Sequence, residues 1–299
     1  MKNAASSLPT WALLFGAALW GVVWYPYRLL AAAGLDGIWA TAATYGVALV
    51  AGAAIFPREA VRLARAPGLA VVMGAAIGWS NLAYVLGVLE GEVMRVLLLF
   101  YLAPLWTVPL AWMLLRERLD GAGVVVMALA FAGAMAMLWK PELGVPWPTA
   151  RAEWLGLAAG FLFALGNVLI RKLDTMTDAG KSIVIWAGVT AAALVHLPAS
   201  HVGAGAAWSA SVRQAPLVVG IGLALVAMSL ALQYGLARMP ANRAIVILLS
   251  ELVVAAIAAY LLAGEVLRPG DWVGGALIVA ASVASGWLNA RRPAPGAPA

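Results

Sequence analysis

The sequence predicts an all-α integral membrane protein with ten transmembrane helices, arranged as two inverted five-helix repeats. The first reason is composition: 64% of the 299 residues are hydrophobic and 11% are charged, whereas a soluble domain carries about 25% charged residues. The second is that the apolar residues come in blocks of about twenty, the length of helix that crosses a hydrocarbon core of about 30 Å. The third is a repeat that aligns the two halves of the chain.

Short breaks separate the apolar blocks, and they contain Gly, Pro or charged residues. The first block continues through Pro26 and Arg28, so we expect a retained helix rather than a cleaved signal peptide. Longer connectors, rich in Pro, Gly, Ser and Ala, are expected at 140–152 and 200–214. The predicted spans are residues 10–31, 37–56, 68–89, 93–115, 121–139, 153–171, 181–199, 215–236, 242–263 and 270–290.

The net charge of +6 lies mainly in short loops, where it sets membrane orientation rather than marking a nucleic-acid surface. Most Lys and Arg residues fall on one side if the N-terminus is inside. The positive-inside rule therefore predicts that both termini are cytoplasmic. The tail "RRPAPGAPA" (291–299) is expected to be disordered in the cytoplasm.

The repeat is visible in paired glycines and, more tellingly, in paired charges, since charged residues are scarce here. An odd number of spans per repeat inserts the two copies in opposite senses, as in secondary transporters whose site lies between the halves. We expect a first repeat at 1–140, a periplasmic connector at 141–152 and a second repeat at 153–290. A shift of 148 positions pairs Gly74 with Gly222, Gly87 with Gly235, Arg95 with Arg243 and Glu117 with Glu265, and a shift of 143 pairs Trp11 with Trp154 and Arg28 with Arg171.

Two stretches resemble the EamA-type half-repeat of the drug/metabolite transporter (DMT) superfamily. "YLAPLWTVPLAWMLLRERL" (101–119) is similar to its helix-4 signature, and "LLSELVVAAIAAYLLAGEVL" (248–267) is similar to the second copy. The family often has Glu-Pro in that copy, whereas here Leu252 follows Glu251. The density of Trp and Tyr resembles bacterial aromatic amino-acid exporters. The resemblance implies a multi-pass protein of the bacterial inner membrane with cytoplasmic termini, working by alternating access without ATP.

Glu251 is the most informative polar residue, because it interrupts an apolar run. An acidic residue at the centre of a membrane helix costs about 2.5–3.5 kcal/mol, so it should face protein or water. It could accept a substrate ammonium group or a coupling proton. It could equally be a structural carboxyl that is hydrogen-bonded to a neighbouring helix.

Other polar and aromatic residues inside the spans complete a candidate cavity. An aromatic amino acid needs an acceptor for its ammonium, donors for its carboxylate and an apolar wall for its ring; asparagines could supply the donors and aromatic side chains the wall. The alternative readings are interhelical glue for Asn and interfacial belts for Trp and Tyr. The predicted substrate-binding residues are Trp20, Trp24, Asn81, Tyr84, Tyr101, Phe163, Asn167 and Glu251, with Glu251 also the coupling candidate.

Enzyme motifs are missing from the sequence. "GKS" (180–182) lacks the glycine that a phosphate loop requires five residues earlier, there is no Gly-x-Ser-x-Gly, and cysteine is absent. We therefore predict no enzyme, cofactor, metal or nucleic-acid partner, and a monomer that contacts its small-molecule substrate and membrane lipid. The predicted function is export of a small amphipathic metabolite, most readily an aromatic amino acid. The alternatives are a DMT-type transporter of another solute, such as other amino acids, hydrophobic cations or a nucleotide sugar, and a non-transporting membrane protein.

Overall fold

The computed structural model describes residues 4–91, 93–139, 147–264 and 267–290, and its regular elements within these ranges are all helices. Ten of the described helical segments are long and apolar enough to cross a membrane. The predicted tail at 291–299 and residues 141–146, half of the predicted connector at 141–152, lie outside the described residues.

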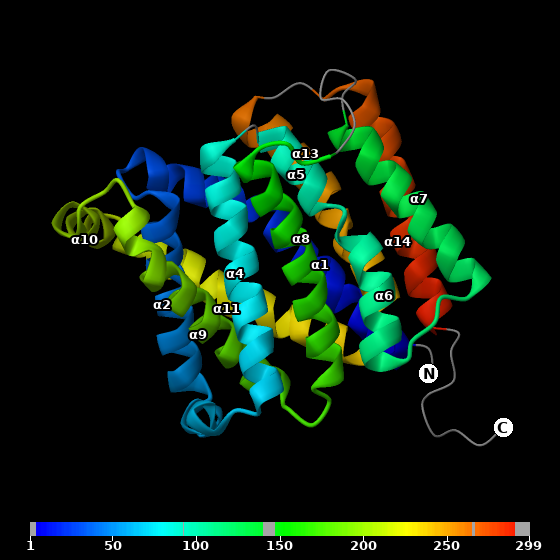
Figure 1. The fold of residues 1–299 in the computed structure, drawn as a ribbon, viewed down its shortest axis with the longest axis horizontal. Helices are drawn as coiled ribbons and strands as arrows, with labels where there is room; N and C mark the ends of the chain where they lie inside the picture. The colour runs from blue at the N-terminus through cyan, green and yellow to red at the C-terminus, as the bar shows by residue number, and fades with distance from the viewer. Residues whose placement is uncertain (1–3, 92, 140–146, 265–266, 291–299) are drawn as a thin grey trace.

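Each predicted span is confirmed as a helical segment, with ends that differ by a few residues (Figure 1). Eight spans are single helices: α1 (Ala4–Ala32), α2 (Gly37–Ile55), α4 (Gly68–Glu90), α7 (Gly121–Leu138), α8 (Arg151–Lys172), α9 (Asp178–His196), α11 (Ala215–Arg238) and α14 (Pro269–Ala290). The other two are α5 (Val93–Phe100) with α6 (Ala103–Leu115), and α12 (Ala241–Leu248) with α13 (Ser250–Ala263). Short helices follow α2 and α9: α3 (Pro57–Arg62), η1 (Leu63–Arg65) and η3 (Leu197–Ala199).

The expected connector at 200–214 links the seventh and eighth spans, and it contains a helix. Residues Ala204–Arg213 form helix α10, at the opposite end of the bundle from α3 (Figure 1). The segment is rich in Ala, the residue with the highest helix propensity. Ala207 and Ala210, three positions apart on one helix face, are buried, and α10 packs against α2 and α11. Small residues therefore serve here as a packed face rather than as a flexible linker.

Helix packing follows a two-fold pattern between the first five spans and the last five. α4 packs on α8 as α11 packs on α1, and α4 packs on α9 as α11 packs on α2. α1 also packs on α13 as α8 packs on α6, and the contacts of α2 with α9 and of α7 with α14 join counterparts directly. Both chain ends lie at the same end of the bundle in Figure 1. This is the arrangement expected of two five-helix repeats that cross the membrane in opposite senses.

The fourth and ninth spans are each broken into two helices, although each is a single apolar block in the sequence. The breaks fall at equivalent places, since a shift of 148 positions superimposes the ends of α5 on those of α12 and the end of α6 on that of α13. The residues that follow α6 and α13 also correspond. Arg116 (φ 59°) and Gly264 (φ 69°) both adopt the left-handed conformation that ends a helix. The equivalence extends to backbone geometry even where side chains differ.

The two breaks have different local causes. Pro104 stands at the start of α6 and has no amide hydrogen, so the helical bond from position 104 to the carbonyl of Phe100 cannot form. Leu252 occupies the equivalent position in the second repeat. Its amide bonds to the carbonyl of Leu249, three residues back, instead of continuing the α-helical pattern. The second break therefore forms without the family's proline.

Glycine residues form close contacts between neighbouring helices. A Cβ atom on Gly160 would lie 2.4 Å from the carbonyl oxygen of Phe100, and one on Gly156 would lie 2.8 Å from that of Val96. Gly78 makes the same kind of approach to Gly188 on α9. These glycines let α8 and α4 pack backbone to backbone against their neighbours.

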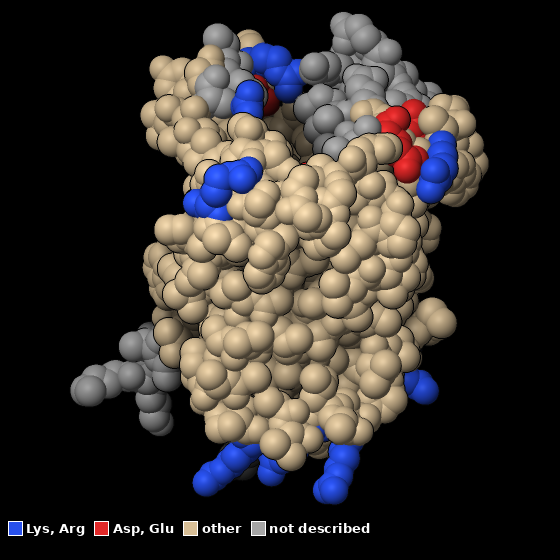
Figure 2. Space-filling view, turned by 90° about the vertical axis from the view of Figure 1, so that its left-hand side faces the viewer, with Lys and Arg blue, Asp and Glu red and all other residues tan. Residues whose placement is uncertain are grey.

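The outer surface has the banding expected of a membrane protein. Figure 2 shows Lys and Arg side chains towards the two ends of the molecule, with a broad uncharged band between them. Seven Trp residues at span ends or in connectors are exposed: Trp11, Trp139, Trp147, Trp154, Trp208, Trp272 and Trp287. That exposure fits side chains that face lipid and headgroups rather than a protein core.

Candidate functional site

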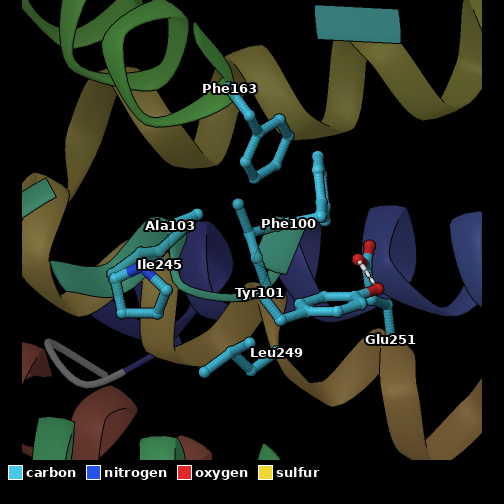
Figure 3. A pocket seen from close by; sticks show the side chains of 9 residues that line it. Phe100, Tyr101, Ala103, Phe163, Ile245, Leu249 and Glu251 are labelled. Atoms are coloured by element: carbon cyan, nitrogen blue, oxygen red, sulfur yellow. Dashed lines mark hydrogen bonds between the residues drawn. The ribbon is translucent and has the colours of Figure 1, made fainter. Parts of the chain in front are cut away.

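The breaks of the fourth and ninth spans meet at a small cavity (Figure 3). Its volume is about 10 Å³, room for about one water molecule and far below the roughly 300–1,000 Å³ of typical ligand pockets. A whole amino acid would need the lining side chains to move apart. The lining residues are Phe100, Tyr101, Ala103, Pro104, Phe163, Ile245, Leu248, Leu249 and Glu251.

A hydrogen bond joins the two broken spans across this cavity. The hydroxyl of Tyr101, at the first break, donates to Oε1 of Glu251, just after the second, over 2.5 Å (Figure 3). Glu251 lies in the first turn of α13, not in the middle of a continuous helix as the sequence predicts. The amide groups of a helix N-terminus favour a negative charge in that position. Glu251 is the sole acidic side chain among the residues that line the cavity.

Three predicted aromatic residues gather around one that the sequence analysis missed. The ring of Phe100 lies 5.4 Å from that of Tyr84, 5.2 Å from that of Tyr101 and 5.4 Å from that of Phe163, between ring centroids. Phe100 precedes Tyr101 directly, but in a continuous helix the two would point in different directions. Only the break shows that both rings face the same space. An unrecognised aromatic residue thus forms the centre of the apolar wall.

Two predicted polar residues lie outside the cavity lining. Asn81 on α4 and Asn167 on α8 are not among the lining residues. Each nevertheless has a buried amide atom without a hydrogen-bond partner in the described chain, Oδ1 of Asn81 and Nδ2 of Asn167. Asn167 stands one helical turn beyond Phe163, which does line the cavity. Asn167 therefore lies one turn beyond the cavity lining on α8, and its amide donor has no partner in the described chain.

The two predicted tryptophans lie on α1 beside the second break. Neither Trp20 nor Trp24 lines the cavity, and both are partly buried. Between them, Gly21 packs so closely on α13 that a Cβ atom there would lie 2.7 Å from the carbonyl oxygen of Glu251. The shift of 143 positions that aligns α1 with α8 pairs Trp20 with Phe163. Trp20 is therefore the two-fold counterpart of a residue that lines the cavity.

Among the described residues, no group of three or more His, Asp or Glu side chains is placed so that it could hold a metal ion. His196, one of the two histidines, packs edge-on against the ring of Trp79, with centroids 4.8 Å apart. What the site offers is one carboxyl group, one phenol that bonds to it, and a wall of aromatic and aliphatic side chains.

Comparisons with known proteins agree with this fold. A comparison with curated protein sequences found no match. Among solved structures, 21 chains match. One of them, titled as the crystal structure of a protein, has a TM-score of 0.71 at 19% sequence identity, and the match covers 97% of this chain and 100% of that one. At this identity the likeness shows the fold alone. Residues 150–286 match the model of the EamA-like transporter family. The second half of the chain is therefore similar to the EamA-like transporter family.

Proposed function

We propose that this protein is a secondary transporter that exports aromatic amino acids across the bacterial inner membrane by alternating access. The observation that carries the proposal is the hydrogen bond between Tyr101 and Glu251, which joins two broken spans beside a cluster of aromatic rings. Broken helices between inverted repeats are where secondary transporters bind their substrates.

Each part of an aromatic amino acid has a counterpart near the cavity. Glu251 accepts a hydrogen bond from the ammonium group of the substrate. This bond replaces the one that Glu251 receives from the hydroxyl of Tyr101 in the structure. Phe100 and Phe163 flank the substrate ring through edge-on or tilted contacts of the kind that they already make with each other. Asn167, whose buried Nδ2 lacks a partner in the described chain, supplies a donor for the carboxylate.

A hydrophobic cation is the second candidate, because the cavity lining combines one acidic group with apolar side chains and includes no basic residue. A phosphorylated solute is disfavoured for the same reason, since it would call for Arg or Lys in the lining. The two candidates differ in one respect: only the amino acid uses a carboxylate.

The test is counterflow in proteoliposomes with labelled phenylalanine, with and without a pH gradient. Unlabelled Phe, Trp and Tyr should compete better than Asp or Lys. Phenethylamine, which lacks the carboxylate, and hydrocinnamate, which lacks the amine, separate the candidates. Weak competition by both supports the amino acid, whereas strong competition by phenethylamine alone points to a hydrophobic cation. Equal competition by every amino acid would remove the aromatic assignment.

A further inference from the structure

A network of charged side chains ties the two halves together at one face of the bundle, where α6, α8 and α11 end and α12 begins; we call this the Arg171 face. Glu117, just beyond α6, accepts a bond from Nε of Arg171 at the end of α8, over 3.3 Å. Its other carboxylate oxygen accepts the amide of Ala241, the first residue of α12, over 2.8 Å. One carboxylate thus joins the first repeat to two helices of the second, α8 and α12.

Arg171 extends the network to a fourth helix. Its guanidinium also donates to the carbonyl oxygen of Ala237 in the last turn of α11. Both charged side chains are largely withdrawn from solvent, with 29% of Arg171 and 19% of Glu117 exposed. Charge-assisted hydrogen bonds in such surroundings are stronger than exposed surface pairs. A second ion pair, between Arg243 of α12 and Asp120 before α7, lies beside this network at 3.6 Å.

The opposite face is not closed in the same way. α6 packs on α12 and α8 packs on α11 at the Arg171 face, but their two-fold counterparts, α13 with α5 and α1 with α4, make no comparable contact in the described chain. The repeat pairs Arg171 with Arg28 at the end of α1. Arg28 is exposed, and Glu265, which the repeat pairs with Glu117, lies outside the described residues. The packing of the described helices is therefore asymmetric, although the sequence repeat is not.

We propose that Glu117 and Arg171 form a latch that closes the Arg171 face and holds the cavity accessible from the opposite face. This inference rests on the proposed transport function and adds to it two residues that never touch the substrate. Opening the Arg171 face separates the ends of α6 and α8 from those of α11 and α12. That movement breaks the bonds of Glu117 to Ala241 and of Arg171 to Ala237 together.

The sequence has no cysteine, so a single introduced cysteine would carry the only thiol in the chain. The latch can therefore be tested by thiol labelling. Ala103 lines the cavity and is 2% exposed, so Ala103→Cys reports access to the cavity itself. A membrane-impermeant maleimide is applied to right-side-out and to inside-out vesicles without substrate. In the otherwise unchanged protein, labelling should come mainly from the face opposite Arg171.

The variant Glu117→Gln keeps the size of the side chain and an oxygen that can accept the amide of Ala241, but it loses the charge that attracts Arg171. In the Ala103→Cys background, we expect labelling of the introduced thiol from the Arg171 face to rise at least about fivefold. Arg171→Gln should act in the same direction, and the double variant should add little, because both changes remove one interaction. Glu59→Gln is the matched control, since Glu59 is as buried as Glu117 but pairs with Arg62 of its own helix α3, in an i,i+3 contact.

The two proposals fail separately in this design. Unchanged labelling in both Glu117→Gln and Arg171→Gln, with protein that remains monodisperse in detergent, would overturn the latch whatever the transport assay shows. A clear rise in labelling without any counterflow of amino acids would keep the latch and remove the proposed substrate. A rise of the same size in Glu59→Gln would show a general loosening of the face, and would also overturn the latch.

Discussion

Glu251 shows how one side chain can satisfy both a structural and a functional interpretation. It accepts a hydrogen bond from Tyr101, as a structural carboxyl would, and it stands at a cavity between the repeats, as a substrate-binding residue would. The geometry alone does not separate these roles, because the same oxygen serves both. A change that preserves the hydrogen bond but removes the charge does separate them.

At Glu251→Gln we expect folding and insertion to persist, since Gln is nearly isosteric and its oxygen can still accept the Tyr101 hydroxyl. Transport should fall and lose its dependence on pH, because an amide can neither ionise nor pair with an ammonium group. The measurement is substrate flux across a pH series at matched membrane levels. Tyr101→Phe is the companion variant, as it removes only the donor. Superimposable pH profiles for the Glu251→Gln variant and the unchanged protein would assign Glu251 to packing.

Among the elements, α8 has the most direct control over the site. It brings Phe163 to the cavity and holds the first break through Gly160, which faces the carbonyl oxygen of Phe100. That oxygen is also the one that Pro104 deprives of its helical partner. The close approach of α8 and the break are therefore parts of one local arrangement.

Gly160→Ala should separate α8 from the break, because the new Cβ would lie 2.4 Å from a backbone oxygen that has little freedom to move. We expect a loss of about 1–3 kcal/mol of stability, as in other overpacked sites, and a lower apparent melting temperature in detergent. Gly46→Ala on α2 is the control. A Cβ there has no neighbour within 4 Å, so stability should stay equal or rise by about 0.5–1 kcal/mol. Equal effects at both positions would contradict the packing argument.

In the whole molecule, short helices lie at each end of the bundle. α3 and η1 lie at one end with the termini, and α10 lies at the other (Figure 1). The arginines on and around α3 and η1 favour a cytoplasmic position for that end under the positive-inside rule. The proposed direction of export and the side on which the latch closes both depend on this orientation.

Single cysteines at two exposed positions test the orientation. Ser209→Cys on α10 should react with an impermeant maleimide in intact cells, whereas Arg65→Cys on η1 should react only after lysis. Both residues are exposed, so a difference in labelling reports sidedness rather than burial. The reverse pattern would place the termini outside, and would reverse the assigned direction of transport.

The sequence by itself determined the membrane class, the ten spans and the repeat. Blocks of about twenty apolar residues have few other ways to fold, and a paired charge such as Arg28 with Arg171 is unusual in a chain with so few charges. It also singled out Glu251, Tyr101, Tyr84 and Phe163, since polar and aromatic residues inside apolar spans are conspicuous. These are properties of single segments and of their order along the chain.

Only the tertiary structure decided how those residues meet. The breaks before Ala103 and before Ser250 depend on which carbonyls find partners, and the second occurs without a proline. The bond between Tyr101 and Glu251 joins residues 150 positions apart, and Phe100 becomes the centre of the aromatic wall only because its helix ends there. The network at the Arg171 face likewise depends on two side chains and two backbone groups that meet only after packing, so no single segment of the sequence could encode it.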